Sequence, residues 1–149
     1  MEEQDKTLLS FQIEDEVFAV DAMKVDHILE VPSQITEVPN TPDYITGIIN
    51  LHGNIITVAD MRILTGQKNK EKGADTSIVV INPTGEQDSK IGLIVDMVKE
   101  VIETESSQFK ETVLEGKKGL INSFEGTVVI NKEFIHVIDL NSFNEIIEK

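Results

Sequence analysis

The sequence predicts an all-β protein with a few short helices and a C-terminal helix. Nine or ten short segments have the two-residue alternation or the compact apolar run of β-strands, and turn residues separate them. Only two or three short segments have helical spacing. A polar stretch at 67–75 lies near the middle of the chain and holds no large apolar side chain. These observations indicate a barrel or a sandwich, and they are compatible with two small barrels.

The N-terminal segment is expected to form two strands joined by a hairpin or a sharp corner. Residues 9–13 alternate between apolar and polar, Glu14 and Asp15 form a polar break, and residues 16–20 resume the extended pattern. Asp21 is expected to cap one helical turn over 21–24. Residues 25–31 fit neither period cleanly, and we expect a strand there.

The strongest local signal is a hairpin around His52 and Gly53. Three prolines between 32 and 42 predict a loop before it, and apolar residues fill 46–51 and 54–58 on its two sides. Gly53 can supply the positive φ that a tight turn requires. Asp60 is expected to cap a short helix through Leu64, which Gly66 would end.

The second half of the chain is expected to contain further strands after a hinge or linker at 67–75. The run 78–81 is apolar on both faces, which predicts burial on both sides, and residues 91–95 form another strand. Gly126 is expected to be the turn of a second hairpin between 120–124 and 127–130. Residues 134–138 predict the last strand, and the spacing of apolar residues at 140, 143 and 147 predicts a C-terminal docking helix.

The size and the charge of the chain exclude several functional classes. The 149 residues suffice for one domain, or for two small ones that share a core. The net charge is −14, and residues 1–60 hold twelve acids against two bases. This acidity excludes electrostatic binding to nucleic acid and disfavours docking to anionic lipid. It is either a solvated surface or a face that steers a basic protein partner, and the second alternative predicts salt-dependent association.

The sequence offers no constellation for catalysis, a metal or a cofactor. It has no cysteine, no nucleophile elbow and no phosphate-binding loop, and its three histidines (His27, His52 and His136) form no paired ligand motif. A small carboxylate-dependent hydrolase remains the enzymatic alternative, although no particular acid pair stands out. The polar N-terminus and the absence of a long apolar run predict a cytoplasmic protein without membrane insertion.

The hairpin and several other segments resemble the family of CheW-type chemotaxis coupling proteins. The family pattern runs Gly-Val-Ile-Asn-Leu-Arg-Gly and then Pro-Val-Ile-Asp-Leu-Arg. The hairpin positions that match it are Gly47, Ile48, Ile49, Asn50, Leu51, Gly53, Val58, Asp60 and Arg62. The segments 18–21, 39–45, 92–96 and 136–140 resemble other family motifs in the same order. Together these similarities extend over about residues 7–147.

The resemblance implies a non-enzymatic adaptor without a cofactor. Its fold would be two five-stranded SH3-like β-barrels, with the first strand packed into the second barrel. The whole of 7–147 would form one domain, in which subdomain 1 covers about 14–66 and subdomain 2 covers about 7–13 with 76–147. Such an adaptor joins the cytoplasmic helical hairpin of chemoreceptors to the regulatory domain of the histidine kinase CheA, at membrane-associated arrays. A scaffold in a pilus-type or other non-chemotactic array is the alternative on the same fold.

The resemblance also implies which positions contact each partner. Val25, His27 and Gly47 match places associated with the kinase, and His52, Gly92 and Val101 match places associated with the receptor. The chain departs from the family at two of these six positions. His27 stands where the family has Glu, and His52 stands where it has Arg, so a mostly neutral imidazole replaces a planar and permanent cation.

Overall fold

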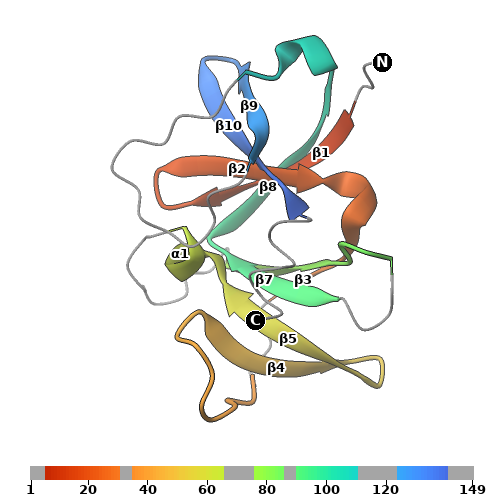
Figure 1. Cartoon of the computed structure of the whole chain (residues 1–149), viewed down its shortest axis with the longest axis vertical. Coiled ribbons are helices and arrows are strands. Elements are labelled where there is room, and N and C mark those ends of the chain that lie inside the picture. The colour runs from red at the N-terminus through yellow and green to blue at the C-terminus, as the bar shows by residue number, and fades with distance from the viewer. Residues whose placement is uncertain (1–5, 31–34, 66–75, 86–89, 111–123, 141–149) are drawn as a thin grey trace.

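Ten strands form two five-stranded sheets, which Figure 1 shows as an upper and a lower lobe. The computed structural model describes residues 6–30, 35–65, 76–85, 90–110 and 124–140. The strands are β1 (Lys6–Ile13), β2 (Glu16–Asp21), β3 (Val25–Glu30), β4 (Ile45–Leu51), β5 (Asn54–Asp60), β6 (Ser77–Ile81), β7 (Ile91–Val95), β8 (Met97–Thr104), β9 (Phe124–Ile130) and β10 (Glu133–Ile138). The short helices are η1 (Ala22–Lys24), α1 (Met61–Leu64) and η3 (Ser106–Gln108). The all-β fold of two five-stranded sheets is therefore confirmed.

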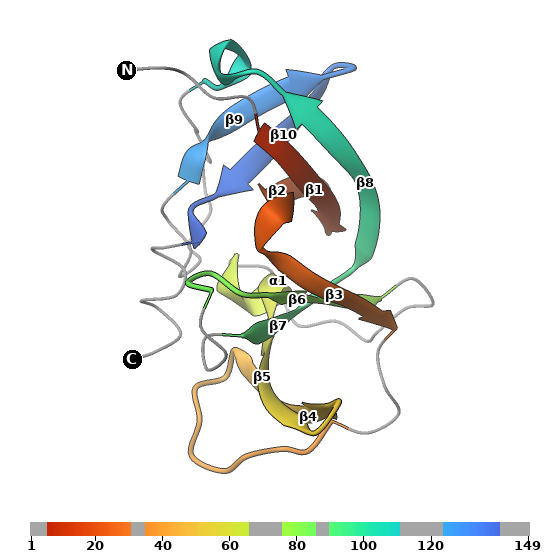
Figure 2. The same ribbon diagram turned by 90° about the vertical axis from the view of Figure 1, so that its right-hand side faces the viewer.

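The two sheets have the same pattern of parallel and antiparallel neighbours, although the chain passes through their strands in a different order. Sheet A has the order β8-β1-β2-β10-β9, and sheet B has the order β3-β6-β7-β5-β4. Each sheet contains one parallel pair, β2 with β10 in sheet A and β5 with β7 in sheet B, and its other neighbours are antiparallel. The chain leaves sheet A after β2, completes sheet B from β3 to β7, and returns through β8. In Figure 2 this strand rises from the level of the lower lobe along the side of the upper lobe.

In each sheet, an isolated backbone bridge links one edge strand to the chain that follows the other edge strand. Thr36, in the chain beyond β3, pairs with Ile48 of β4, and Lys110, beyond β8, pairs with Thr127 of β9. A glycine directly precedes the bridged residue in each strand: Gly47 precedes Ile48, and Gly126 precedes Thr127. A Cβ on Gly47 would lie 2.2 Å from the carbonyl oxygen of Thr36, and a Cβ on Gly126 would lie 2.9 Å from that of Lys110. Both glycines therefore permit a close backbone approach that curls the sheet toward a barrel.

Three apolar clusters form the core, and the largest lies between the two sheets. A cluster inside sheet A includes Val17 and Val137, and a cluster inside sheet B includes Ile56 and Val80. The third cluster joins side chains from both sheets, among them Leu9, Phe11, Phe18, Val20, Val79, Ile81, Ile91, Leu93 and Val95. Strands such as β6 and β7 bury one face in their own sheet and the other against the partner sheet. This double burial confirms the prediction for 78–81.

Several local predictions are confirmed in the described residues. β1 and β2 form the expected hairpin, and Glu14 takes a positive φ of 57° in its turn. The side chain of Asp21 caps η1 by accepting a hydrogen bond from the backbone N–H of Met23 at 2.9 Å. The expected helix end at Gly66, the hinge at 67–75 and the C-terminal helix beyond Leu140 lie outside the described residues.

The predicted role of Gly126 is wrong. Gly126 lies inside β9. The observed hairpin joins β9 to β10, and its turn is formed by Asn131 and Lys132, which have φ values of 53° and 68°. Gly126 is needed where β9 meets the chain at Lys110, because a side chain there would collide with backbone. The part of the expected first strand at 120–123 is outside the described residues.

The sheets also divide the chain differently from the expected subdomain boundaries. β2 was expected in the first subdomain and β6 and β7 in the second, whereas the strand pairing places β2 in sheet A and β6 and β7 in sheet B. The physical reason lies in the strand pairing: β2 pairs with β1 and β10, whereas β6 pairs with β3 and β7 pairs with β5. The polar stretch at 67–75 therefore connects two strands of one sheet.

Candidate functional site

The β4–β5 hairpin presents its two turn residues to solvent. His52 and Gly53 both have positive φ values, 53° and 86°, which is the pattern of a type I′ turn. The backbone N–H of Gly53 donates to the side-chain oxygen of Asn50 at 2.9 Å, and this bond fixes the turn. The expected hairpin is confirmed. The positive φ at His52 was not anticipated, because only Gly53 has the residue type that favours it.

His27 and His52 contact each other, although they belong to opposite edges of sheet B. Their ring centroids lie 5.6 Å apart with an interplanar angle of 44°. His27 belongs to edge strand β3, and His52 follows edge strand β4. The two positions at which the chain departs from the CheW pattern are therefore one structural pair.

Asp26 orients the ring of His27. The His27 Nδ1 lies 2.7 Å from a carboxylate oxygen of Asp26, and the same oxygen lies 3.2 Å from the Lys90 ammonium. Because an ionised carboxylate only accepts, Nδ1 carries the proton in this arrangement. Partial burial acts to raise the pKa of Asp26, but the hydrogen bonds from His27 and Lys90 outweigh it and hold that pKa below its ordinary value.

Asp60 and Arg62 form a buried ion pair directly after the hairpin. Asp60 caps α1 by accepting from the backbone N–H of Arg62 at 2.9 Å, as predicted. Its two carboxylate oxygens also accept from Nε and Nη2 of Arg62, each at 3.2 Å. The two side chains can face each other although they are only two residues apart, because Asp60 is the extended residue before the helix.

Asp96 connects this ion pair to sheet A. One of its carboxylate oxygens lies 3.7 Å from Nε of Arg62, and the other accepts from the backbone N–H of Glu14 at 2.8 Å. The backbone N–H of Asp96 donates to the carbonyl of Gln12 at 3.0 Å. The charged cluster thus ties the exit of the β4–β5 hairpin to the β1–β2 turn. Residue types alone did not reveal this role, although Asp96 follows a buried strand as Asp21 and Asp60 do.

The other predicted contact positions differ in exposure. Val101 of β8 is 60% exposed, and Val25 at the start of β3 is half-buried. Gly47 and Gly92 are buried inside sheet B. A Cβ on Gly92 would lie 2.8 Å from Cγ2 of Ile78. Because Gly47 and Gly92 have no side chain, each can affect a binding surface only through the position of its backbone.

His136 is buried in sheet A and does not belong to this surface. Its Nδ1 lies 2.9 Å from the hydroxyl of Thr127, and its ring packs against Phe18 and Phe124. Burial lowers the pKa of His136, and the carboxylate of Glu16, 3.8 Å from Nε2, opposes this shift.

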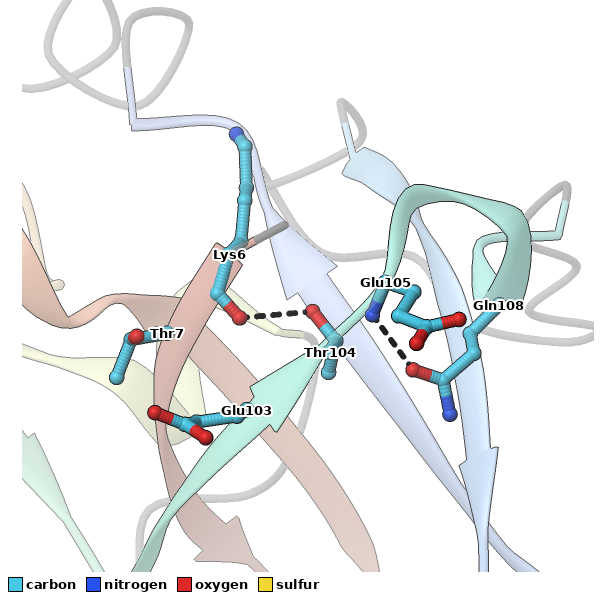
Figure 3. Close-up of a pocket in the computed structure, with 6 residues that line it drawn as sticks. All are labelled: Lys6, Thr7, Glu103, Thr104, Glu105 and Gln108. Atoms are coloured by element: carbon cyan, nitrogen blue, oxygen red, sulfur yellow. Dashed lines mark hydrogen bonds between the residues drawn. The ribbon is translucent and has the colours of Figure 1, made fainter. Parts of the chain in front are cut away.

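A polar pocket of about 550 Å³ lies between β1, β8 and η3 (Figure 3). Its lining residues are Lys6, Thr7, Glu103, Thr104, Glu105 and Gln108. The hydroxyl of Thr104 donates to the carbonyl of Lys6 at 3.0 Å, and the backbone N–H of Glu105 donates to the side chain of Gln108 at 2.6 Å. These bonds hold η3 and β8 in place, and the lining includes none of the positions that the resemblance marks.

No group of three or more metal-ligating side chains converges in the ranges that the structure covers. No helix in those ranges is long and apolar enough to cross a membrane.

Comparison with known proteins gives one consistent answer. The family model of the CheW-like domain matches residues 7–147. The chain is 31% identical over 102 residues to the chemotaxis protein CheW of Klebsiella aerogenes, an alignment that covers 68% of this chain and 59% of that protein. It is 28% identical over 137 residues to the chemotaxis protein CheW of Thermotoga maritima, covering 89% and 87%.

A solved structure extends this similarity to three dimensions. The crystal structure of the scaffolding protein TtCheW from Thermoanaerobacter tengcongensis superposes with a TM-score of 0.78 at 30% identity, covering 91% of this chain and 90% of that one. The two five-stranded sheets, the hairpin motif and the family match over almost the whole length agree with one another. The chain belongs to the CheW-like domain family.

Proposed function

We propose that the chain is a non-enzymatic adaptor that couples chemoreceptors to the histidine kinase CheA, acting by binding alone. The observation that carries this proposal is the family match over residues 7–147, together with the likeness to a solved scaffolding protein. We expect the adaptor to act in the cytoplasm, recruited to membrane-associated receptor arrays.

The proposed kinase-side positions are Val25, His27 and Gly47, and the proposed receptor-side positions are His52, Gly92 and Val101. His27, His52 and Val101 have accessible side chains and can contact a partner directly. Gly47 and Gly92 would act by keeping strands β4 and β7 close to their neighbours. A substitution at either glycine would therefore change binding through the shape of sheet B.

Binding of purified partners tests the proposal. Calorimetry with a CheA regulatory domain, and separately with a receptor cytoplasmic helical hairpin, should detect association with Kd values below about 50 µM. Absence of both associations at that concentration would contradict the proposal. Association with a receptor of a pilus-type array but not with a chemoreceptor would instead support the alternative scaffold function.

A pair of matched variants tests the receptor side. Val101→Lys and Val129→Lys both place a lysine at an exposed strand valine, with 60% and 45% of the residue exposed, but only Val101 lies at a predicted receptor position. We expect Val101→Lys to weaken receptor binding about tenfold or more while kinase binding is retained. If the two variants bind the receptor hairpin equally well, Val101 is not part of the receptor-binding surface.

A further inference from the structure

The chain passes from sheet B to sheet A through a single residue, Asp96. Strand β7 of sheet B ends at Val95, and strand β8 of sheet A begins at Met97. The other passage between the sheets in the described chain, from β2 to β3, has three residues, Ala22–Lys24. Because one residue has only two soft backbone dihedrals, the conformation of Asp96 determines the angle at which β8 leaves β7.

Sheet A holds Asp96 by both its backbone and its side chain. The backbone N–H of Asp96 donates to the carbonyl of Gln12 on β1 at 3.0 Å. One oxygen of its carboxylate accepts from the backbone N–H of Glu14, in the β1–β2 turn, at 2.8 Å. The side-chain amide of Gln12 donates in turn to the carbonyl of Glu14 at 2.9 Å, so the three residues form one connected group.

Sheet B holds the same carboxylate through Arg62. The other oxygen of Asp96 lies 3.7 Å from Nε of Arg62, and only 3% of the Arg62 side chain is exposed. Arg62 is itself fixed by Asp60, the last residue of β5, whose two oxygens accept from Nε and Nη2. Asp60 is in register with Ile94 of β7. The carboxylate of Asp96 therefore contacts groups fixed to both sheets, at the residue where the chain crosses between them.

The proposed partner positions divide unequally between the two sheets. All three proposed kinase-side positions belong to sheet B, on strands β3 and β4. The proposed receptor-side positions divide between the sheets. Gly92 lies on β7 and His52 directly follows β4, both in sheet B, whereas Val101 lies on β8 of sheet A. The receptor surface therefore depends on how the two sheets are oriented, and the kinase surface does not.

We infer that Asp96 is a positioning residue for the receptor-binding surface. Its carboxylate fixes the orientation of sheet A relative to sheet B, and with it the place of Val101 relative to His52 and Gly92. The apolar cluster between the sheets stabilises their contact without a preferred direction, whereas hydrogen bonds have narrow angular limits. A surface that is already arranged for its partner binds more tightly, because less ordering is needed on association. The effect on the receptor rests on the proposed function, but the orientation of the sheets can be measured without a partner.

Residual dipolar couplings of the backbone amides test the orientation in the free full-length protein. In Asp96→Ala, the couplings of the two sheets should no longer fit the wild-type arrangement with one alignment tensor, although each sheet fits by itself. Asp21→Ala is the matched control, because Asp21 lies at the other crossing but accepts only from the backbone N–H of Met23, two residues away. It should keep the wild-type arrangement. If Asp96→Ala fits that arrangement as well as Asp21→Ala does, the inference is wrong.

Calorimetry with the two partners tests the effect on binding. Asp96→Ala should lower the affinity for the receptor helical hairpin about tenfold and leave the affinity for the CheA regulatory domain within about twofold. Asp96→Asn keeps an oxygen for the Glu14 N–H but loses the charge beside Arg62, so it should lower receptor affinity less, about threefold. Arg62 keeps Asp60 as a counter-charge in both variants, so we expect both to fold. Asp21→Ala should bind both partners as the wild type does.

The two affinities together distinguish positioning from a general structural role. Retained kinase binding shows that sheet B is intact, so a selective loss of receptor binding supports the inference. An equal loss for both partners, or unchanged receptor binding in Asp96→Ala, would overturn it. Failure of the wild type to bind the receptor hairpin would contradict the proposed function instead, and the dipolar couplings would still decide whether Asp96 sets the orientation of the sheets.

Discussion

The β4–β5 and β9–β10 hairpins are two versions of one structural unit. Residues 47–61 and 126–140 align without a gap and share a glycine at the start (Gly47 and Gly126), an isoleucine, a valine and an aspartate (Asp60 and Asp139). Each hairpin is the third and last antiparallel pair along its sheet order, and each has a two-residue turn with positive φ. The repeat therefore preserves the positions that shape the barrel.

The differences lie at the turn and on the surface. The first turn is His52-Gly53, with the ring of His27 beside it, whereas the second turn is Asn131-Lys132. Thr57 in the first hairpin corresponds to the buried His136 in the second. The comparison teaches that backbone requirements are duplicated within the chain, whereas only the first of the two hairpins contains proposed partner contacts, Gly47 and His52.

The largest effect is expected at the two duplicated glycines, and it should be unequal. In Gly47→Ala the new methyl would lie 2.2 Å from the Thr36 carbonyl oxygen, and in Gly126→Ala it would lie 2.9 Å from that of Lys110. Urea unfolding should show losses of roughly 3 kcal/mol or more for the first and about 1–2 kcal/mol for the second. Gly85→Ala, at a turn with open space around it and a φ of 84°, measures the strain of alanine at a positive φ without a collision. Equal losses of unfolding free energy for Gly47→Ala and Gly126→Ala would contradict the difference between these two close backbone approaches.

The next effect compares ion pairs of the two hairpins. Arg62 is buried against Asp60, whereas Lys99 of β8 and Glu133 of β10 form an accessible pair at 3.0 Å. Arg62→Gln should lower the free energy of unfolding by about 3 kcal/mol, because it leaves a buried carboxylate without its partner. Lys99→Gln should change it by less than about 0.5 kcal/mol. A small loss for Arg62→Gln would mean that the pair does not tie the sheets together.

A smaller effect concerns His136, which occurs in only one hairpin. Because burial lowers the pKa of His136 in the folded state, the unfolded chain binds the proton more readily. The stabilisation is complete above the ordinary histidine pKa of about 6.5 and decreases as the pH falls below it. Thermal unfolding between pH 7.5 and 5.5 should show a steeper loss for the wild type than for His136→Gln. Parallel losses would contradict this assignment.

The smallest effect on stability is expected at two equivalent surface positions. Ile55 and Phe134 occupy matching places in the two hairpins, and both are 63% exposed. Ile55→Ser and Phe134→Ser should each change the free energy of unfolding by less than about 0.5 kcal/mol, since the side chains remain largely hydrated when folded. A loss above about 1 kcal/mol in one of them would show that its side chain packs more deeply than its twin.

Local chemistry predicts the elements of this chain well. The strand at 9–13, the turn signal at Gly53 and the caps Asp21 and Asp60 all depend on residues close together in the sequence, and all of them appear in the structure. The same local reasoning misplaced the second turn, because Gly126 suggested a turn while the turn itself contains no glycine. A glycine in a strand pattern can mark either a turn or a close approach, and only the distant partner Lys110 distinguishes them.

The sequence by itself thus determined the all-β class, most strand positions, the first hairpin and the family motifs. Only the tertiary structure decided the pairing of β2 with β10 and of β5 with β7, and with it the membership of each sheet. It also decided that Arg62 reaches both Asp60 and Asp96, and that His27 touches His52. The physical reason is the distance along the chain over which each kind of interaction acts. Periodicity, turns and caps act between near neighbours, whereas these contacts join residues that only the closed fold brings together.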